Sequence, residues 1–141
     1  MESRLTIITL GVADLTASEH FYNQVFGWPK AESSNENIIF FTLNGLQLAL
    51  YPRQKLAEDA GLSEGGQGFA GFSLAHNLRS TDDVDLLFEH FKNLNVPIIK
   101  PPQKVFWGGY SGYLSDPDGY LWEIAYNPYL SLDEAGNISG G

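Results

Sequence analysis

The sequence contains no cysteine, few basic residues and no long apolar run. The lack of cysteine excludes disulfides and any zinc or iron–sulfur site held by thiolates, and it fits the reducing cytoplasm in which we expect the protein. Only 8 Lys and Arg stand against 17 Asp and Glu, giving a net charge of −9. Because phosphate backbones and anionic membranes bind clustered basic side chains, neither is an expected partner. The first residues lack a signal-peptide pattern, and no stretch is long enough to span a bilayer.

Apolar and aromatic residues are plentiful, at 43% and 13% of the 141 residues, which is enough for one packed domain. The first half predicts a strand over 5–12 and a helix that Asp14 caps and Gly27 ends. Two strands follow, over 38–43 and 46–51, joined by the hairpin signal Asn44-Gly45. A short helix from Arg53 and a Gly-rich linker complete this half.

The second half repeats this order of elements. We expect a strand over 72–77, a helix opened by Ser80, and short strands over 96–99 and 105–107. The final hairpin turns at Asp116-Pro117-Asp118-Gly119, a sequence typical of tight turns. Strand, helix, strand and hairpin thus occur twice, which indicates an internal duplication. We therefore predict one α+β domain of two paired βαβββ modules, at about 4–52 and 69–128, with a linker at 53–68 and a frayed polar tail at 129–141.

Two segments resemble the vicinal oxygen chelate superfamily, which includes glyoxalases, bleomycin-resistance proteins and extradiol dioxygenases. They are VADLTASEHFYNQVFGW near the start and SDPDGYLWEIAYNP near the end, and with the duplication the resemblance covers residues 5–128. It implies a curved mixed sheet around a cavity, and a homodimer. Members use the cavity for isomerisation, ring cleavage, thiol transfer or drug sequestration, so the fold indicates a place and leaves the chemistry open.

The metal-dependent members place four ligands on strands, two in each half, and the resemblance carries these positions to Ile7, Gln47, Phe72 and Glu123, with Ala49 as an alternative to Gln47. Ile7 and Phe72 fall where imidazoles usually stand, and neither can coordinate a metal. Two remaining oxygen donors are too few for a divalent ion. We therefore expect no cofactor, with Gln47 and Glu123 as remnants of a metal site and a bound divalent metal as the lesser possibility.

Glu123 and His76 are the candidate catalytic residues. A carboxylate in an apolar pocket has a raised pKa and can act as an acid or base, or it can hold a cationic or hydroxylated ligand. Glu123 can equally be a structural carboxylate, hydrogen-bonded to Gln47 or to a tyrosine. His76 shares a strand face with Phe72 and is either a general base beside Glu123 or a histidine at the rim of the fold.

The segment 106–113 interleaves aromatic residues with glycines. Trp107, with Tyr110 and Tyr113 as further candidates, either forms a wall against which a flat ligand stacks or belongs to core packing beside a bulge at Gly108-Gly109. The 61–70 loop is either a lid or a simple connector.

We predict a metal-independent protein that binds an apolar or aromatic small molecule. The predicted ligand-binding residues are Ile7, Gln47, Phe72, His76, Trp107, Tyr110 and Glu123. A metal-dependent lyase or isomerase of the lactoylglutathione lyase type, or a dioxygenase relative, is the alternative. A domain that only binds other proteins is the third possibility.

Overall fold

The computed structural model describes residues 3, 6–60, 63–65, 69–70 and 72–140. The chain divides into two compact units, residues 1–67 and 68–141, each of which is described by itself. Residues 61–62 and 66–68 of the loop predicted to be either a lid or a connector lie outside the described residues. Within them, no helix is long and apolar enough to cross a membrane.

Unit 1 contains a three-stranded sheet of order β1-β3-β2, formed by Ile7–Val12, Gln47–Pro52 and Ile39–Thr42. β1 pairs with β3 in parallel, and β2 pairs with β3 antiparallel across the predicted Asn44-Gly45 turn, where Gly45 has a φ of 80°. One bridge between Lys30 and Phe41 continues the sheet beyond β2. The short helix α2, Arg53–Asp59, follows β3 as predicted and contacts β1.

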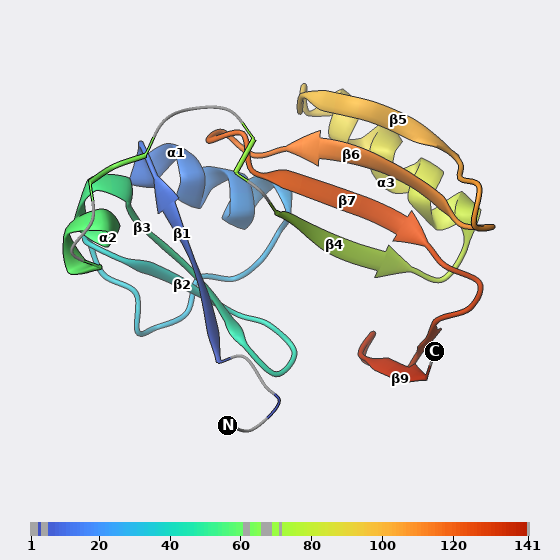
Figure 1. Ribbon diagram of the computed structural model, residues 1–141, viewed down its shortest axis with the longest axis horizontal. Helices are drawn as coiled ribbons and strands as arrows, with labels where there is room; N and C mark the ends of the chain where they lie inside the picture. The colour runs from blue at the N-terminus through green and yellow to red at the C-terminus, as the bar shows by residue number, and fades with distance from the viewer. Residues whose placement is uncertain (1–2, 4–5, 61–62, 66–68, 71, 141) are drawn as a thin grey trace. The chain divides into compact units, whose positions relative to one another are not determined.

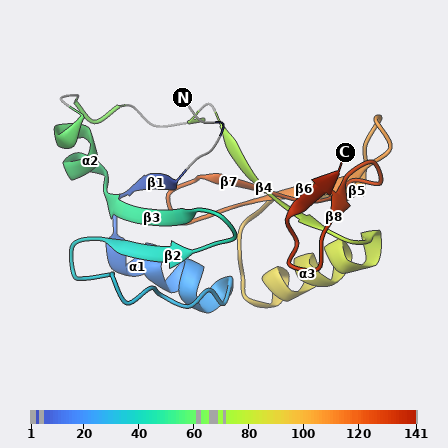
Figure 2. The same cartoon turned by 90° about the horizontal axis from the view of Figure 1, so that it is seen from below.

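The predicted first helix consists of two consecutive segments, an α-helix followed by a π-helical turn. It begins as α1, Leu15–His20, where the Asp14 carboxylate accepts a hydrogen bond from the Ala17 N–H at 3.1 Å. It then widens into a π-helical turn, η1, Phe21–Val25, which the apolar spacing did not predict. Both lie against one face of the unit 1 sheet (Figures 1 and 2). The buried core of this unit includes Leu10, Tyr22, Phe41, Leu48 and Leu50.

Unit 2 contains a four-stranded sheet of order β4-β7-β6-β5, formed by Ser73–Leu78, Leu121–Tyr126, Tyr110–Ser115 and Ile98–Lys104. Its first strand also pairs in parallel with its last, as in unit 1. Helix α3, Thr81–Asn93, lies on one face of this sheet (Figures 1 and 2). Ser80 caps this helix as predicted, accepting a hydrogen bond from the Asp83 N–H at 3.1 Å.

Strand β5 corrects two of the predicted strands. The sequence predicted strands over 96–99 and 105–107, but one strand spans Ile98–Lys104 and includes Pro101 and Pro102. An edge strand tolerates proline, because its outer N–H groups need no partner, and the pairing with β6 is irregular on both sides of Lys100. Residues 105–109 form a turn instead of a strand, closed by the Val105 N–H donating to the Gly109 carbonyl at 3.0 Å.

The end of the chain also differs from the predicted frayed tail. Strands β8, Ser131–Leu132, and β9, Ile138–Gly140, form a hairpin. The Asp133 carboxylate organises its turn by accepting from the Ala135 N–H at 3.0 Å and the Asn137 N–H at 2.8 Å. Arg79 donates to the Asp133 carbonyl at 2.8 Å, which ties the hairpin to the end of β4. Polar composition predicted a tail, while these side-chain hydrogen bonds stabilise a turn.

Candidate functional site

Glu123 lies in the middle of β7, and the predicted Asp116-Pro117-Asp118-Gly119 turn fixes its position. The Asp116 carboxylate accepts hydrogen bonds from the N–H groups of Asp118 and Tyr120, each at 2.9 Å, and Gly119 has a φ of 83°. This turn aligns β6 with β7 so that Tyr113 is directly opposite Glu123. On its other side Glu123 is opposite Ala75 of β4.

The two faces of the unit 2 sheet differ in character. Trp122 and Ile124 are buried, and helix α3 contacts the strand that carries them. Since side chains alternate along a strand, Glu123 points to the other face, together with Leu121 and Ala125. This second face is called the Glu123 face below. It is formed by the side chains of Ser73, Ala75, Asn77, Ser111, Tyr113, Ser115, Leu121, Glu123 and Ala125, of which Ser111, Ser115 and Ala125 are buried.

Tyr113 is the partner of Glu123 on this face. Burial, the negative charge of Glu123 and a hydrogen bond to its carboxylate together raise the pKa of the Tyr113 hydroxyl above its ordinary value of 10.0. Both side chains are half-buried. A carboxylate bonded to a tyrosine is one of the structural roles considered for Glu123, and the same pair presents an acceptor and a hydroxyl to any molecule bound on the face.

Ile7 and Gln47 of unit 1 are brought together by the parallel pairing of β1 with β3, in which they are direct partners. The Gln47 side-chain amide of β3 donates a hydrogen bond to the Thr42 hydroxyl of β2 at 3.2 Å. Ile7 is 44% exposed although it is a large apolar residue. Ala49, the alternative position, is fully buried and pairs with Thr9 instead.

Phe72 and His76 are not beside Glu123 within unit 2. Phe72 precedes β4, and its ring centroid lies 5.8 Å from that of Tyr120. Tyr120 is three residues before Glu123, which is about 10 Å along an extended strand. His76 pairs with Ile124, so the register places it on the face opposite to Glu123. Its side chain is exposed, but neighbouring protein removes enough water to lower the pKa of the imidazole. The sheet therefore does not assemble the predicted His76–Glu123 acid–base pair.

The aromatic segment divides between the two faces. Tyr110 is on the α3 side of the sheet, where its hydroxyl donates to the Asp85 carboxylate at 2.5 Å, and this hydrogen bond raises the pKa of the phenol. Trp107 belongs to the turn after β5 and lies over Gly109, where an added Cβ would be 2.0 Å from its ring. Tyr113, weighed in the sequence and not retained among the predicted ligand-binding residues, is the aromatic residue directly opposite Glu123 in the strand register.

The residues at the four family positions do not fit a divalent metal. Ile7 and Phe72 have no donor atom, and Gln47 and Glu123 supply one neutral and one charged oxygen ligand. The neighbours of Glu123 in register, Ala75 and Tyr113, add no nitrogen donor. Throughout the described part of the chain, no group of three or more His, Asp and Glu side chains is arranged to hold a metal ion. No chemical step is therefore assigned to a metal.

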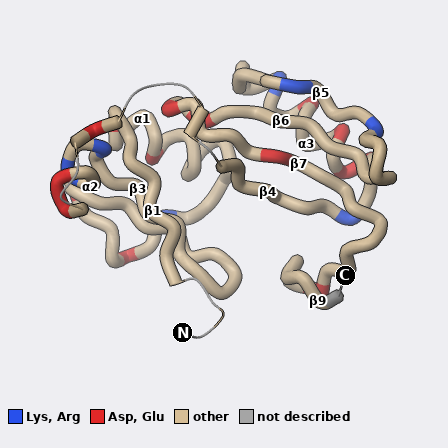
Figure 3. Tube along the Cα trace, in the orientation of Figure 1, with Lys and Arg blue, Asp and Glu red and all other residues tan. Residues whose placement is uncertain are grey.

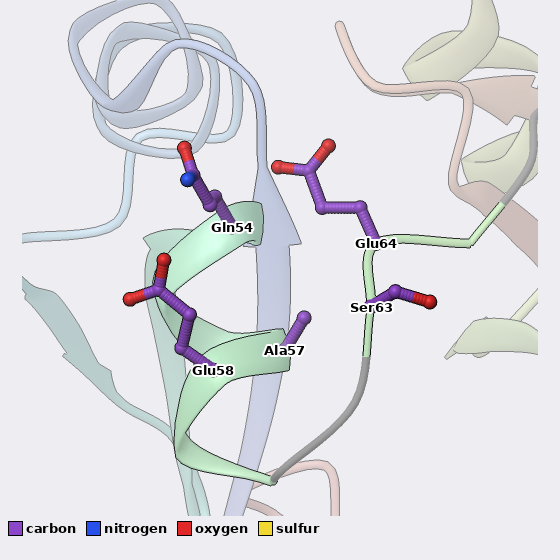
Figure 4. Close-up of a pocket in the computed structure, with 5 residues that line it drawn as sticks. All are labelled: Gln54, Ala57, Glu58, Ser63 and Glu64. Carbon is purple, nitrogen blue, oxygen red and sulfur yellow. The ribbon is translucent and has the colours of Figure 1, made fainter.

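The surface hollows formed by described residues include two that contain no predicted site residue. One, of about 400 Å³, lies between α2 and residues 63–64, with Gln54 and Glu58 on the helix and Ser63 and Glu64 across from it (Figure 4). The other, of about 260 Å³, lies between the end of β4 and the C-terminal hairpin and is lined by Leu78, Arg79, Tyr126, Asn127, Pro128, Leu130 and Leu132.

Each unit has a main sheet whose first strand along the chain pairs in parallel with its last, and a helix on one face of that sheet. This arrangement defines an α+β protein of the glyoxalase type. Residues 4–124 match the family model of the Glyoxalase/Bleomycin resistance protein/Dioxygenase superfamily, and the chain belongs to this family.

Similar solved structures agree with this assignment. A glyoxalase-related enzyme from Fulvimarina pelagi is 36% identical, with 98% of each chain covered and a TM-score of 0.88. A lactoylglutathione lyase from Agrobacterium tumefaciens is 25% identical over 90% of this chain and 96% of that one, with a TM-score of 0.72. The fosfomycin resistance protein FosX from Listeria monocytogenes is 28% identical over 90% and 95%, with a TM-score of 0.69.

Proposed function

We propose that this protein binds an apolar or aromatic small molecule on the Glu123 face without using a metal ion. The observation that carries this proposal is the surroundings of Glu123. Glu123 is the one acidic residue at a family ligand position, and its cross-strand partners are Ala75 and Tyr113. A metal centre would need further donor side chains at these neighbouring positions. Ala75 is exposed and Leu121 half-buried, so the surface next to the carboxylate is apolar, which favours an organic ligand over a hydrated cation.

The composition of the face suits such a ligand. Small-molecule sites combine a mostly apolar lining with a few polar groups that fix orientation. Here Ala75 and Leu121 supply apolar surface, while Glu123 and Tyr113 supply an acceptor and a hydroxyl. Helix α3 occupies the opposite face, so no described helix of unit 2 covers this one (Figure 2). The other predicted contacts, Ile7, Gln47, Phe72, His76 and Trp107, remain predictions.

The test uses naphthalenemethanol, a neutral aromatic probe, titrated into the full-length protein in buffer with EDTA. We expect saturable binding that Ala75→Phe weakens by about tenfold or more, because the added ring fills the space beside Glu123. Ile99→Phe, which makes a similar change at an exposed position of β5, is the matched control and leaves the affinity unchanged. Absence of binding, or equal loss in both variants, overturns the proposal.

A metal-dependent lyase or isomerase is the second candidate, favoured by the similarity to the Agrobacterium tumefaciens lactoylglutathione lyase and by the acidic residue at position 123. It requires a stoichiometric divalent metal in protein purified without chelator, which elemental analysis measures. We further propose a cytoplasmic homodimer, because the sequence lacks cysteine and resembles a family whose members are often dimers. Light scattering of the purified chain tests the dimer.

A further inference from the structure

The Glu123 carboxylate has unused hydrogen-bonding capacity. An ionised carboxylate offers about four acceptor sites, and the hydroxyl of Tyr113, directly opposite in register, is the hydrogen-bonding group beside Glu123 on β6. Ala75, on the other side, contributes only a methyl group. Because Glu123 is half-buried, part of the water that would fill the remaining sites is already excluded.

No basic side chain neutralises this carboxylate within the described residues. Glu123 forms no ion pair there, and neither β6 nor β7 contains Lys or Arg (Figure 3). Lys100 of β5 is opposite Tyr113, one strand further out, so its backbone is about 10 Å from that of Glu123 across two strand spacings. The face therefore carries the Glu123 carboxylate at its centre, with Ala75 and Leu121 beside it, serine and asparagine side chains further along the strands, and Lys100 at its edge.

A bound cation stabilises a half-buried carboxylate only if its own hydrogen bonds are also satisfied. A divalent metal needs more donors than the face offers. An organic ammonium group needs fewer, since it can donate to both the Glu123 carboxylate and the lone pairs of the Tyr113 hydroxyl. Its apolar part would then cover Ala75 and Leu121.

We propose, resting on the function proposed above, that the Glu123 face selects apolar molecules that carry a protonated amine, with Glu123 as the counter-charge and Tyr113 as the second hydrogen-bonding partner. Nothing in this recognition involves a covalent step. The net charge of −9 adds a long-range attraction for such cations, which must be separated from the local effect of Glu123.

The test compares three probes with one ring system, naphthylmethylamine, naphthalenemethanol and naphthoic acid, by calorimetric titration of the full chain at neutral pH. We expect the amine to bind more tightly than the alcohol by about tenfold or more, the range of a charge-assisted hydrogen bond, and the acid to bind least. In Glu123→Gln the ratio of amine to alcohol affinity falls toward one. In Glu89→Gln, an equal charge change at an exposed position of α3, the ratio keeps its wild-type value.

The outcomes separate this inference from the proposal on which it rests. If none of the probes binds, the proposed function itself is overturned. If amine and alcohol bind equally, the amine preference is overturned while small-molecule binding stands. If Glu89→Gln lowers the ratio as much as Glu123→Gln, the preference comes from net charge and Glu123 is not the counter-charge. Because the wild-type affinity order is informative by itself, a Glu123→Gln protein that does not fold still leaves the inference open to refutation.

Discussion

Gly112 of β6 packs closely against helix α3 and against the neighbouring edge strand β5. Replacing it with alanine should measurably destabilise unit 2. A Cβ at this position would be 2.6 Å from the Lys100 carbonyl oxygen, 2.7 Å from the Phe88 ring and 2.8 Å from the Pro102 nitrogen. Two of these atoms are backbone, so a rotamer change cannot relieve the overlap. The cost of overpacking, about 1–3 kcal/mol, exceeds the roughly 0.5–1 kcal/mol that alanine gains over glycine in the unfolded chain.

The expected net loss is therefore about 1–2 kcal/mol, or roughly 3–8 °C in melting temperature for a chain of this size. Urea and thermal unfolding of Gly112→Ala measure it. Gly65→Ala is the control, because its nearest contact would be an ordinary 3.5 Å from the Arg53 side chain. Equal stability of Gly112→Ala and wild type would refute the close packing of Gly112 against α3 and β5.

The remaining predictions concern individual polar side chains. Ser18 is fully buried, and its hydroxyl has no partner among the described residues, so Ser18→Ala should raise the unfolding free energy by about 1 kcal/mol. Ser80→Ala, which removes the α3 cap, should lower the unfolding free energy by about 1 kcal/mol. Denaturant titration measures both variants, and a change of the same sign in both would contradict these predictions. Tyr113 is protonated more readily in the folded state, so its contribution to stability is present below pH 10 and is lost as the pH rises through its raised pKa. Glu123→Gln should return that pKa toward 10.0, and an unchanged value in an NMR titration would show that Tyr113 and Glu123 do not interact.

Local signals predicted much of the fold because each had one physical cause. The caps at Asp14 and Ser80 and the turns at Gly45 and Gly119 all appear where the sequence places them. The failures came from composition. The strands predicted over 96–99 and 105–107 left out Pro101 and Pro102, which lie within one edge strand, and a polar C-terminal segment suggested fraying although Asp133 closes a turn there.

The candidate site was only partly predictable, because it depends on register. Counting outward from the Asp116–Gly119 turn pairs position 113 with 123, so the partner of Glu123 could have been found from the hairpin alone. The same count places Tyr110 on the other face, with α3. The pairing of β4 with β7 is a long-range contact that no local pattern fixes, and it places Ala75 beside Glu123 and His76 on the opposite face.

The most direct test of the central claim is the naphthalenemethanol titration repeated on two samples, one treated with EDTA and one supplied with Ni²⁺, Zn²⁺, Mn²⁺ or Fe²⁺. The account predicts the same affinity in both and no metal-dependent rise in melting temperature. Binding that disappears with EDTA and returns with one of these metals would contradict it, and would make the metal-dependent lyase or isomerase the better account.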